Sequence, residues 1–154
     1  KLHRMNIFEA LRVSHDTQRE LAARLTAAQV SAEERERVFG DLKRELLAHE
    51  TAEERCFYVP LFEHDATVDA SRHAIAEHHE MDEMVEDMEK LQAGGAAWME
   101  HAKKLAHKVN HHLEEEERKF CQQAGKVLTE RQKTDLARVY EAEFLTLRAG
   151  EHAA

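Results

Sequence analysis

The chain has 154 residues, which suits one compact domain able to bury a core without disulfide bonds. Its net charge of -9 comes without a cluster of Lys and Arg, which argues against a nucleic-acid partner, and no apolar run approaches the roughly 18 residues that span a membrane. Two cysteines are too few for a disulfide framework and fit a cytoplasmic protein. Only five Gly and one Pro interrupt a sequence rich in helix-forming residues, so the composition predicts an all-α fold.

Capping and turn signals divide the chain into five predicted helices. The signals are the capping-box pair Ser31 and Glu34, Pro60 with the polar connection 63–71, the pair Gly94-Gly95, and Gly125 at the end of the fourth helix. The helices are expected near residues 4–28, 32–59, 70–92, 96–124 and 130–148. We expect the first four to form an up-down-up-down four-helix bundle over 4–124. The fifth is expected to cover the bundle with Leu136, Val139, Tyr140, Phe144 and Leu147, a dimer contact being the alternative.

Each of the four long helices carries a stripe of residues at alternating three- and four-residue steps, the spacing that faces the core of a bundle. Polar residues interrupt every stripe. Four of these interruptions are histidines: His15, His49, His78 and His112. On two stripes a glutamate follows one helical turn after the histidine, and these are Glu53 and Glu116.

The histidines reveal a duplication within the chain. His78 follows His15 by 63 residues, and His112 follows His49 by the same 63. At this offset Glu53, Glu54 and Phe57 correspond to Glu116, Glu117 and Phe120. The chain therefore resembles two copies of one helical hairpin, and closing them with approximate two-fold symmetry would bring two equivalent sets of polar side chains together.

Four histidines and two glutamates buried together in a core indicate that cations bind there. A buried carboxylate without a partner is costly, and no Lys or Arg lies on the stripes to pair with Glu53 or Glu116; Arg19, at a helix flank, is the nearest candidate. Imidazole suits iron, zinc, copper and nickel, and carboxylates bridge two metals readily. We therefore expect two metal ions between four histidines and two glutamates, a metal-free helical scaffold being the alternative.

These motifs resemble those of the hemerythrin-like, or HHE cation-binding, family, over roughly residues 5–125 and within a single hemerythrin-like domain 1–154. They comprise His15 on the first helix, His49-x-x-x-Glu53-Glu54 on the second, Glu77-His78 on the third and His112-x-x-x-Glu116-Glu117 on the fourth. The resemblance implies His15, His49, His78 and His112 as terminal ligands and Glu53 and Glu116 as bridging ligands. It also implies two Fe ions with an oxo or hydroxo bridge.

Two positions require a choice of register. His112 with Glu116 is preferred to His111 with Glu115, because only the former continues the stripe and matches His49 with Glu53. His78 is preferred to His79, which is expected to face outward.

Three further residues have alternative roles. Oxygen-carrying hemerythrins have a further histidine at the position four residues after His78, where this chain has Asp82. Asp82 is either an extra ligand, an outer hydrogen-bond acceptor or a solvated residue. Tyr58 is either packing or a hydrogen-bonding partner of an oxygen species at the site. Cys56 is either a small apolar residue or a redox-active thiol near it.

The preferred hypothesis is a non-haem di-iron protein that binds or reacts with peroxide, O2 or NO, with catalase-like or peroxidase-like turnover and an unknown electron donor. The alternative is an O2, NO or iron sensor or binding module without turnover. Zinc is the alternative metal, although six mixed ligands suit an octahedral iron pair better than tetrahedral zinc. A monomer or weak dimer without nucleic-acid or membrane partners is expected.

Overall fold

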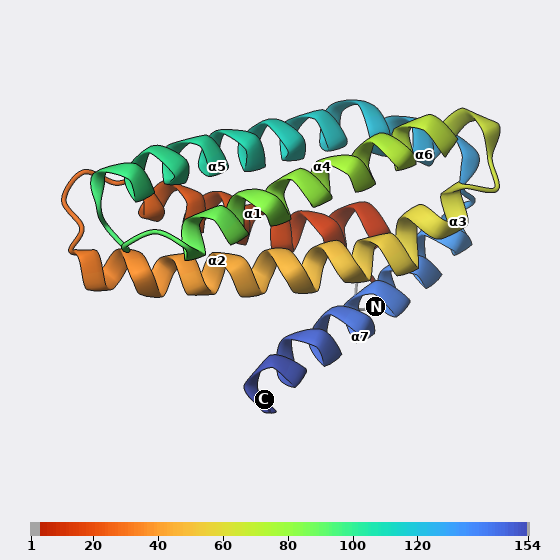
Figure 1. Cartoon of the computed structure of the whole chain (residues 1–154). Helices are drawn as coiled ribbons and strands as arrows, with labels where there is room; N and C mark the ends of the chain where they lie inside the picture. Colours follow the sequence, from red (N-terminus) through yellow and green to blue (C-terminus); the bar gives the residue numbers. More distant parts are fainter. Residues whose placement is uncertain (1–3, 154) are drawn as a thin grey trace.

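Four long helical rods run side by side, and a fifth helix crosses them obliquely (Figure 1). The computed structural model describes residues 4–153, and within that range it contains no strand. The elements are α1 (Ile7–Leu25), α2 (Ala32–Glu53), the π-helical turn η1 (Glu54–Tyr58), α3 (Val59–Leu61), α4 (Asp65–Glu89), α5 (Ala96–Glu115), the π-helical turn η2 (Glu116–Phe120), α6 (Cys121–Val127) and α7 (Glu130–Ala153). This confirms the predicted all-α bundle with an additional C-terminal helix.

Side-chain caps fix the first two helices. A full capping box opens α1, where Asn6 accepts from the backbone N–H of Glu9 and the Glu9 carboxylate accepts from that of Asn6, so the helix begins at residue 7 and not at 4. Only half of the predicted box opens α2. Ser31 accepts from the N–H of Glu34, but the Glu34 carboxylate pairs with Arg24 at 2.7 Å instead of reaching back.

The connection before α4 is shorter than predicted. The sequence placed a loop at 63–71, but α4 begins at Asp65. The hydroxyl of Thr67 donates to the carbonyl oxygen of Leu61 at 2.7 Å and so ties the new helix to the end of α3. The polar residues that suggested a loop form the first turns of α4, where an acidic residue such as Asp65 is favoured by the helix dipole.

Two long rods continue through a wide turn. α2 passes through η1 into α3, and α5 passes through η2 into α6. The π-helical turn of the first rod begins directly after Glu53, and that of the second begins at Glu116. Such turns occur often at functional sites. The predicted end at Gly125 was wrong, because α6 continues to Val127 with Gly125 against the ring of Phe8.

Gly94 forms the predicted turn between the third and fourth rods. Its φ of 78° lies in the left-handed region that favours glycine. A Cβ atom at this position would also lie 2.9 Å from the Cβ of Ala32, which is too close for any other residue.

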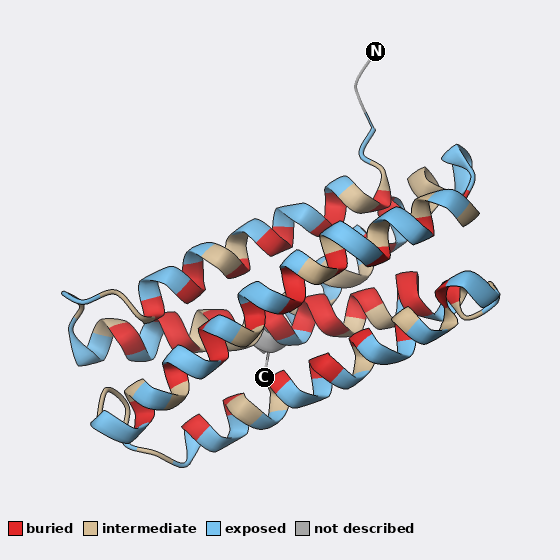
Figure 2. Cartoon of the chain, turned by 90° about the horizontal axis from the view of Figure 1, so that it is seen from above, coloured by how far each residue is buried: buried red, intermediate tan, exposed pale blue. Residues whose placement is uncertain are grey.

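The buried faces of the helices meet along the centre of the bundle (Figure 2). Two apolar clusters fill it. One contains Ile7, Leu11, Phe57, Leu61, Phe120 and Tyr140, and the other contains Leu25, Val38, Leu42, Met88, Trp98 and Leu105. Residue 15 of α1 lies between Leu11 of the first cluster and Leu21 of the second, so the two clusters enclose the level at which the predicted histidines enter the core.

The last helix packs obliquely against α1 and α2 (Figure 1). Ala137 and Tyr140 are buried, and Leu136, Phe144 and Leu147 pack beside them. Val139, which the sequence placed on the same side, is 48% exposed, so that assignment was wrong. Among the described residues, no helix combines the length and apolar character needed to cross a membrane.

Candidate metal centre

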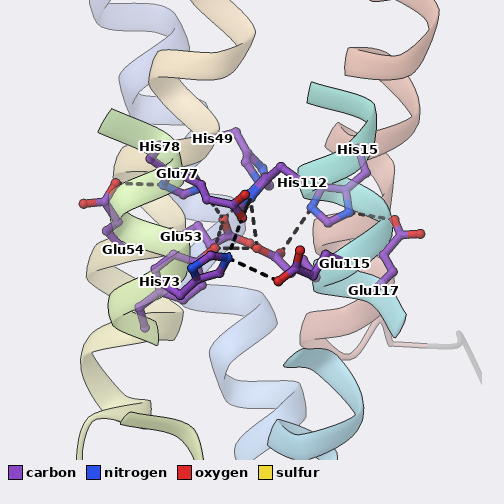
Figure 3. Close-up of polar contacts among 12 residues, drawn as sticks. His15, His49, Glu53, Glu54, His73, Glu77, His78, His112, Glu115 and Glu117 are labelled. Atoms are coloured by element: carbon purple, nitrogen blue, oxygen red, sulfur yellow. Dashed lines mark hydrogen bonds and ion pairs between the residues drawn. The ribbon is translucent and has the colours of Figure 1, made fainter. Parts of the chain in front are cut away.

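Six polar side chains converge in the middle of the bundle, and each is 3% exposed or less (Figure 3). They come from all four rods: His15 from α1, His49 and Glu53 from α2, His78 from α4, His112 from α5 and Glu116 from the start of η2. All six residues that the sequence singled out as ligands are thus brought to one place. By contrast, His79 and His111 have side chains 73% and 60% exposed, as expected for the rejected registers.

The six side chains divide into two overlapping groups of potential ligands. One group contains His15 and His49, the other contains His78 and His112, and both groups share Glu53 and Glu116. Within each group the ligand atoms lie within 4.8 Å of one another. Two neighbouring cations could therefore each take two imidazoles while sharing both carboxylates.

Among the residues that the structure describes, the inner atoms of these groups have no hydrogen-bonding partner. This holds for the Nε2 atom of every one of the four histidines, for Oε2 of Glu53 and for Oε1 of Glu116. Leaving such atoms unpaired in a buried site is costly, so native proteins pair them with a donor, water or a cation. The unpartnered imidazole nitrogens and carboxylate oxygens form a mixed N and O set that fits divalent transition metals.

The two halves of the site are arranged alike. The rings of His15 and His49 have centroids 5.0 Å apart and planes at 68°, and the rings of His78 and His112 repeat both values. The Nε2 atoms of His15 and His112 each lie 3.5 Å from Glu116. The sequence duplication is therefore also a structural one.

An outer set of side chains holds the other ring nitrogen of each histidine. The Nδ1 atom of His15 lies 2.7 Å from Glu117, that of His78 lies 2.9 Å from Glu54, and that of His112 lies 2.9 Å from Glu77. The Nδ1 atom of His49 instead lies 2.8 Å from the hydroxyl oxygen of Tyr140 on α7. A partner that accepts from Nδ1–H leaves Nε2 as the nitrogen free to bind a metal, which is the usual arrangement around ligand histidines.

The charges in the site indicate a shortage of positive charge. Burial alone would lower the pKa of His15, but its contacts with Glu116 and Glu117 outweigh burial and raise that pKa to about 9. Contacts with Glu53 and Glu54 likewise raise the pKa of His78 against the effect of burial. Burial would raise the pKa of Glu53, but the nearby imidazoles hold it well below its usual range. Protons on the imidazoles thus supply the positive charge that bound metal cations would otherwise supply.

Tyr58 links the two shared carboxylates. Its hydroxyl lies 2.7 Å from Oε1 of Glu53 and 2.5 Å from Oε2 of Glu116, and its single proton can be donated to only one of them at a time. Burial, followed by the charges of the two carboxylates, raises the pKa of this phenol well above its usual range. Tyr58 therefore remains a neutral donor at the centre of the site and also packs on Phe120.

The sequence model of the hemerythrin HHE cation binding domain matches residues 6–124. The chain belongs to the hemerythrin HHE cation-binding family. Among curated protein sequences none matches this HHE chain. Its fold is similar to the crystal structure of an HHE cation-binding domain-containing protein, an Rv2633c homolog from Mycobacterium kansasii, with a TM-score of 0.82 and 22% sequence identity over 95% of this chain and 89% of that one. The HHE family is one of metal-binding domains, which agrees with the paired groups of His and Glu.

The sequence left the roles of several residues around the HHE site open. Cys56 lies in the apolar cluster, as one of its two alternatives expected. Asp82 lies outside both groups and interacts with the buried carboxyl of Glu50, whose pKa is raised by burial. Burial, and after it the charges of Glu116 and Glu53, raise the pKa of the Cys121 thiol. The pKa of the Cys56 thiol is raised by burial and then by Glu143 on α7. The sequence did contain a signal for the outer carboxylates of Glu54 and Glu117, because these two residues correspond to each other in the duplication.

A pocket of about 320 Å³ leads from the surface to the HHE centre. It lies between α4 and the rod formed by α5, η2 and α6, and its lining includes His112, Glu116, Ala70 and Phe120. A third group of potential ligands lines the same pocket, with Nε2 of the exposed His73 lying 3.2 Å from Glu115 and 3.5 Å from Glu77 (Figure 3). The pocket gives a small molecule a route to one side of the site.

Proposed function

We propose that this HHE protein holds two iron ions between the four histidines and the two shared glutamates, and that it reacts there with a small oxidant such as peroxide, O2 or NO. The observation that carries the proposal is the pair of four-residue groups that share Glu53 and Glu116. Their unpartnered atoms are all nitrogen and oxygen, the donors that iron takes in carboxylate-bridged sites.

Iron is favoured over zinc by the proposed reaction, which needs open positions on the metal. The four donors of each group would complete a tetrahedral zinc site, whereas an octahedral iron would keep open positions. The open positions are needed if a small oxidant is to bind. The pocket lined by His112 and Glu116 supplies its path.

The chain's own residues have three roles in this proposal. The outer carboxylates Glu54, Glu77 and Glu117 orient the imidazoles through their Nδ1 atoms. Tyr58 places a neutral O–H group between the shared carboxylates, where it can donate a hydrogen bond. Phe57 and Phe120 stack beside it and restrict the access of water from that end. The iron pair, when bound, would supply the electrons that are exchanged with the oxidant.

Catalase-like turnover is the simplest reaction of this kind. One molecule of hydrogen peroxide is oxidised to dioxygen and releases two protons and two electrons, while a second takes them up and is reduced to two molecules of water. The reaction therefore needs no outside electron donor. Peroxidase-like turnover would require a donor of electrons in addition.

The test begins with elemental analysis of freshly purified protein, where two irons per chain are expected. The iron-loaded protein is then mixed with hydrogen peroxide, and the evolution of oxygen is compared with that of free iron and of the His49→Ala/His112→Ala variant. Oxygen evolution well above both controls supports turnover. Two bound irons without such a rate would reject the reaction and keep the site.

One contact favours a sensor as the second candidate function. The hydroxyl oxygen of Tyr140 lies 2.8 Å from Nδ1 of His49, so a change at the site has a direct connection to α7. In a sensor, loading the site or exposing it to O2 or NO would change the protease sensitivity of α7. Digestion at equal rates with and without metal and gas would exclude this function.

A further inference from the structure

The two halves of the site differ in the side chains that hold the histidines from outside. At the offset of 63 residues, His49 corresponds to His112, Ser14 to Glu77, and Glu45 to Lys108. The histidines are thus repeated, whereas the residue type is repeated at neither of the two outer positions. The consequence for the two imidazoles can be followed contact by contact.

In the second half a carboxylate touches the imidazole directly. The Nδ1 atom of His112 lies 2.9 Å from Oε1 of Glu77, and the other oxygen of Glu77 lies 3.1 Å from Nζ of Lys108. A charged acceptor therefore accepts the hydrogen bond from Nδ1–H. Lys108 holds that acceptor in place.

In the first half the carboxylate lies farther away. Ser14 is too short to replace Glu77, and its hydroxyl donates to Glu45 at 2.6 Å. The place next to His49 is taken by the hydroxyl of Tyr140, whose oxygen lies 2.8 Å from Nδ1. His49 Nδ1–H can then donate to the neutral hydroxyl oxygen of Tyr140, while the carboxylate of Glu45 accepts from Ser14 instead.

We propose that Tyr140 of α7 positions His49 and, because it is a neutral acceptor where the other three histidines have carboxylates, makes the His15/His49 metal position the more weakly held of the two. The inference rests on the proposed two-metal function. Charge-assisted hydrogen bonds are roughly twice as strong as neutral ones. A carboxylate on Nδ1–H also makes the imidazole a stronger donor to the metal.

Other differences around the site do not cancel this one. Each half has one outer carboxylate tempered by a cation, since Glu117 pairs with Arg19 at 2.8 Å and Glu77 pairs with Lys108 at 3.1 Å. The hydroxyl of Tyr58 contacts both shared carboxylates and so does not favour one position. Among the partners of the four Nδ1 atoms, the difference between the halves is the replacement of a charged acceptor by Tyr140.

Two further features agree with a dedicated role for this contact. Tyr140 lies beyond residues 6–124, so α7 adds the missing acceptor to the part of the chain that matches the HHE family. Its side chain is 2% exposed, and its hydroxyl oxygen lies 2.8 Å from Nδ1 of His49. A helix that only covered the bundle would not need a hydroxyl here.

The test follows the release of iron from protein loaded anaerobically with Fe(II). A coloured ferrous chelator is added, and the release of the two irons is recorded in time. The wild-type protein is expected to lose one iron faster than the other. Tyr140→Phe keeps the ring and removes the hydroxyl, and it is expected to speed the faster release about 10-fold or more without changing the slower one, in line with the usual cost of losing an outer partner.

Three variants make the result specific. Ser14→Ala leaves Tyr140 in place and is expected to speed the same release to a smaller extent, which provides a second test if Tyr140→Phe does not fold. Glu77→Gln is expected to speed the slower release. Val139→Ala changes the exposed neighbour of Tyr140 on α7 and is expected to leave both releases unchanged.

Each outcome bears on a different claim. Release from Tyr140→Phe that equals the wild type, or that is faster by the same factor for both irons, would overturn this inference alone. Fewer than two irons per wild-type chain would overturn the proposed function and the inference with it.

Discussion

The Nδ1 atom of His15 lies 2.7 Å from Oε2 of Glu117, a residue on the last rod of the bundle. The contact has a counterpart in the other half, where Glu54 holds His78 at 2.9 Å. In both cases the carboxylate directly follows a shared glutamate in the sequence and reaches a histidine of the other hairpin. The two hairpins therefore hold each other's proposed ligands in place.

Replacing Glu117 by Gln should weaken metal binding without unfolding the bundle. The amide keeps the size of the side chain but loses the charge that holds Nδ1–H of His15, which typically costs about 10–100-fold in metal affinity. Competition with a chelator of known affinity measures the change, and Glu54→Gln should give a similar loss. The control is Glu114→Gln, because Glu114 is exposed and pairs only with Arg118. Equal affinities for Glu117→Gln and Glu114→Gln would contradict the role assigned to the outer carboxylates.

The duplication explains why the sequence predicted that these six side chains meet in the core. Four histidines and two glutamates recur at one offset and lie on helical stripes, so both their burial and their convergence follow from spacing. Not all of the residues that accept from Nδ1–H recur at this offset. Glu77 corresponds to Ser14, and the acceptor of His49 comes from α7, which has no counterpart in the repeat.

The role of Tyr58 could not be read from helical spacing. Tyr58 follows Glu53 by five residues, and in an α-helix residues three or four apart share a face. In the π-helical turn η1 the hydrogen bonds run between residues five apart, which brings Tyr58 over Glu53. Nothing in the sequence other than the repeated Glu-Glu-x-x-Phe pattern marks where such a turn occurs.

Without metal, the protein should lose stability as the pH rises toward 9. The pKa of His15 is raised to about 9, above the value of about 6.5 in an unfolded chain, so its protonation stabilises the fold fully below that lower value and is lost as the pH rises through 9. The pKa of Glu117 is lowered to about 2, so its contribution is present above about pH 4.5 and is lost only as the pH falls through 2. The free energy of unfolding in urea should therefore be larger at pH 6 than at pH 9.

The variant His15→Gln separates this effect from general repulsion in an acidic chain. Its pH dependence should be flatter than that of the wild type, whereas His79→Gln, at an exposed position, should behave like the wild type. A wild-type protein as stable at pH 9 as at pH 6 would refute the prediction.

Loading with metal should raise the melting temperature. A ligand present at 100 times its dissociation constant stabilises the folded state by about 2.7 kcal/mol, and a domain of this size gains roughly 2–4 °C per kcal/mol, so each site should add about 5–10 °C. The increase should fall by about half in His78→Ala/His112→Ala, which removes both imidazoles of one of the two groups and leaves the other group intact. It should persist in His79→Ala/His111→Ala, which changes the exposed neighbours of the same histidines. Equal increases in both double variants would exclude the proposed ligands.

Tyr58→Phe should destabilise the metal-free protein more than the loaded one. The substitution removes the hydroxyl that contacts both Glu53 and Glu116, and a buried carboxylate left without a donor costs about 1–3 kcal/mol. Bound cations would compensate most of that charge. Urea unfolding with and without metal measures the difference, and Phe57→Leu, which changes packing alone, should cost the same in both states.

Filling the pocket beside His112 should block the reaction while leaving the metal in place. Ala70 lines this pocket of about 320 Å³ and is not among the proposed ligands. Ala70→Trp would place an indole in the path to Glu116, so we expect the rate of oxygen evolution from peroxide to fall about 10-fold or more, which corresponds to at least about 1.4 kcal/mol in the barrier. Iron content and melting temperature should stay close to those of the wild type. Glu36→Trp, which lines a separate groove on α2, is the control and should react like the wild type. An unchanged rate in Ala70→Trp would mean that the oxidant reaches the centre by another route, and the pocket would lose its assigned role.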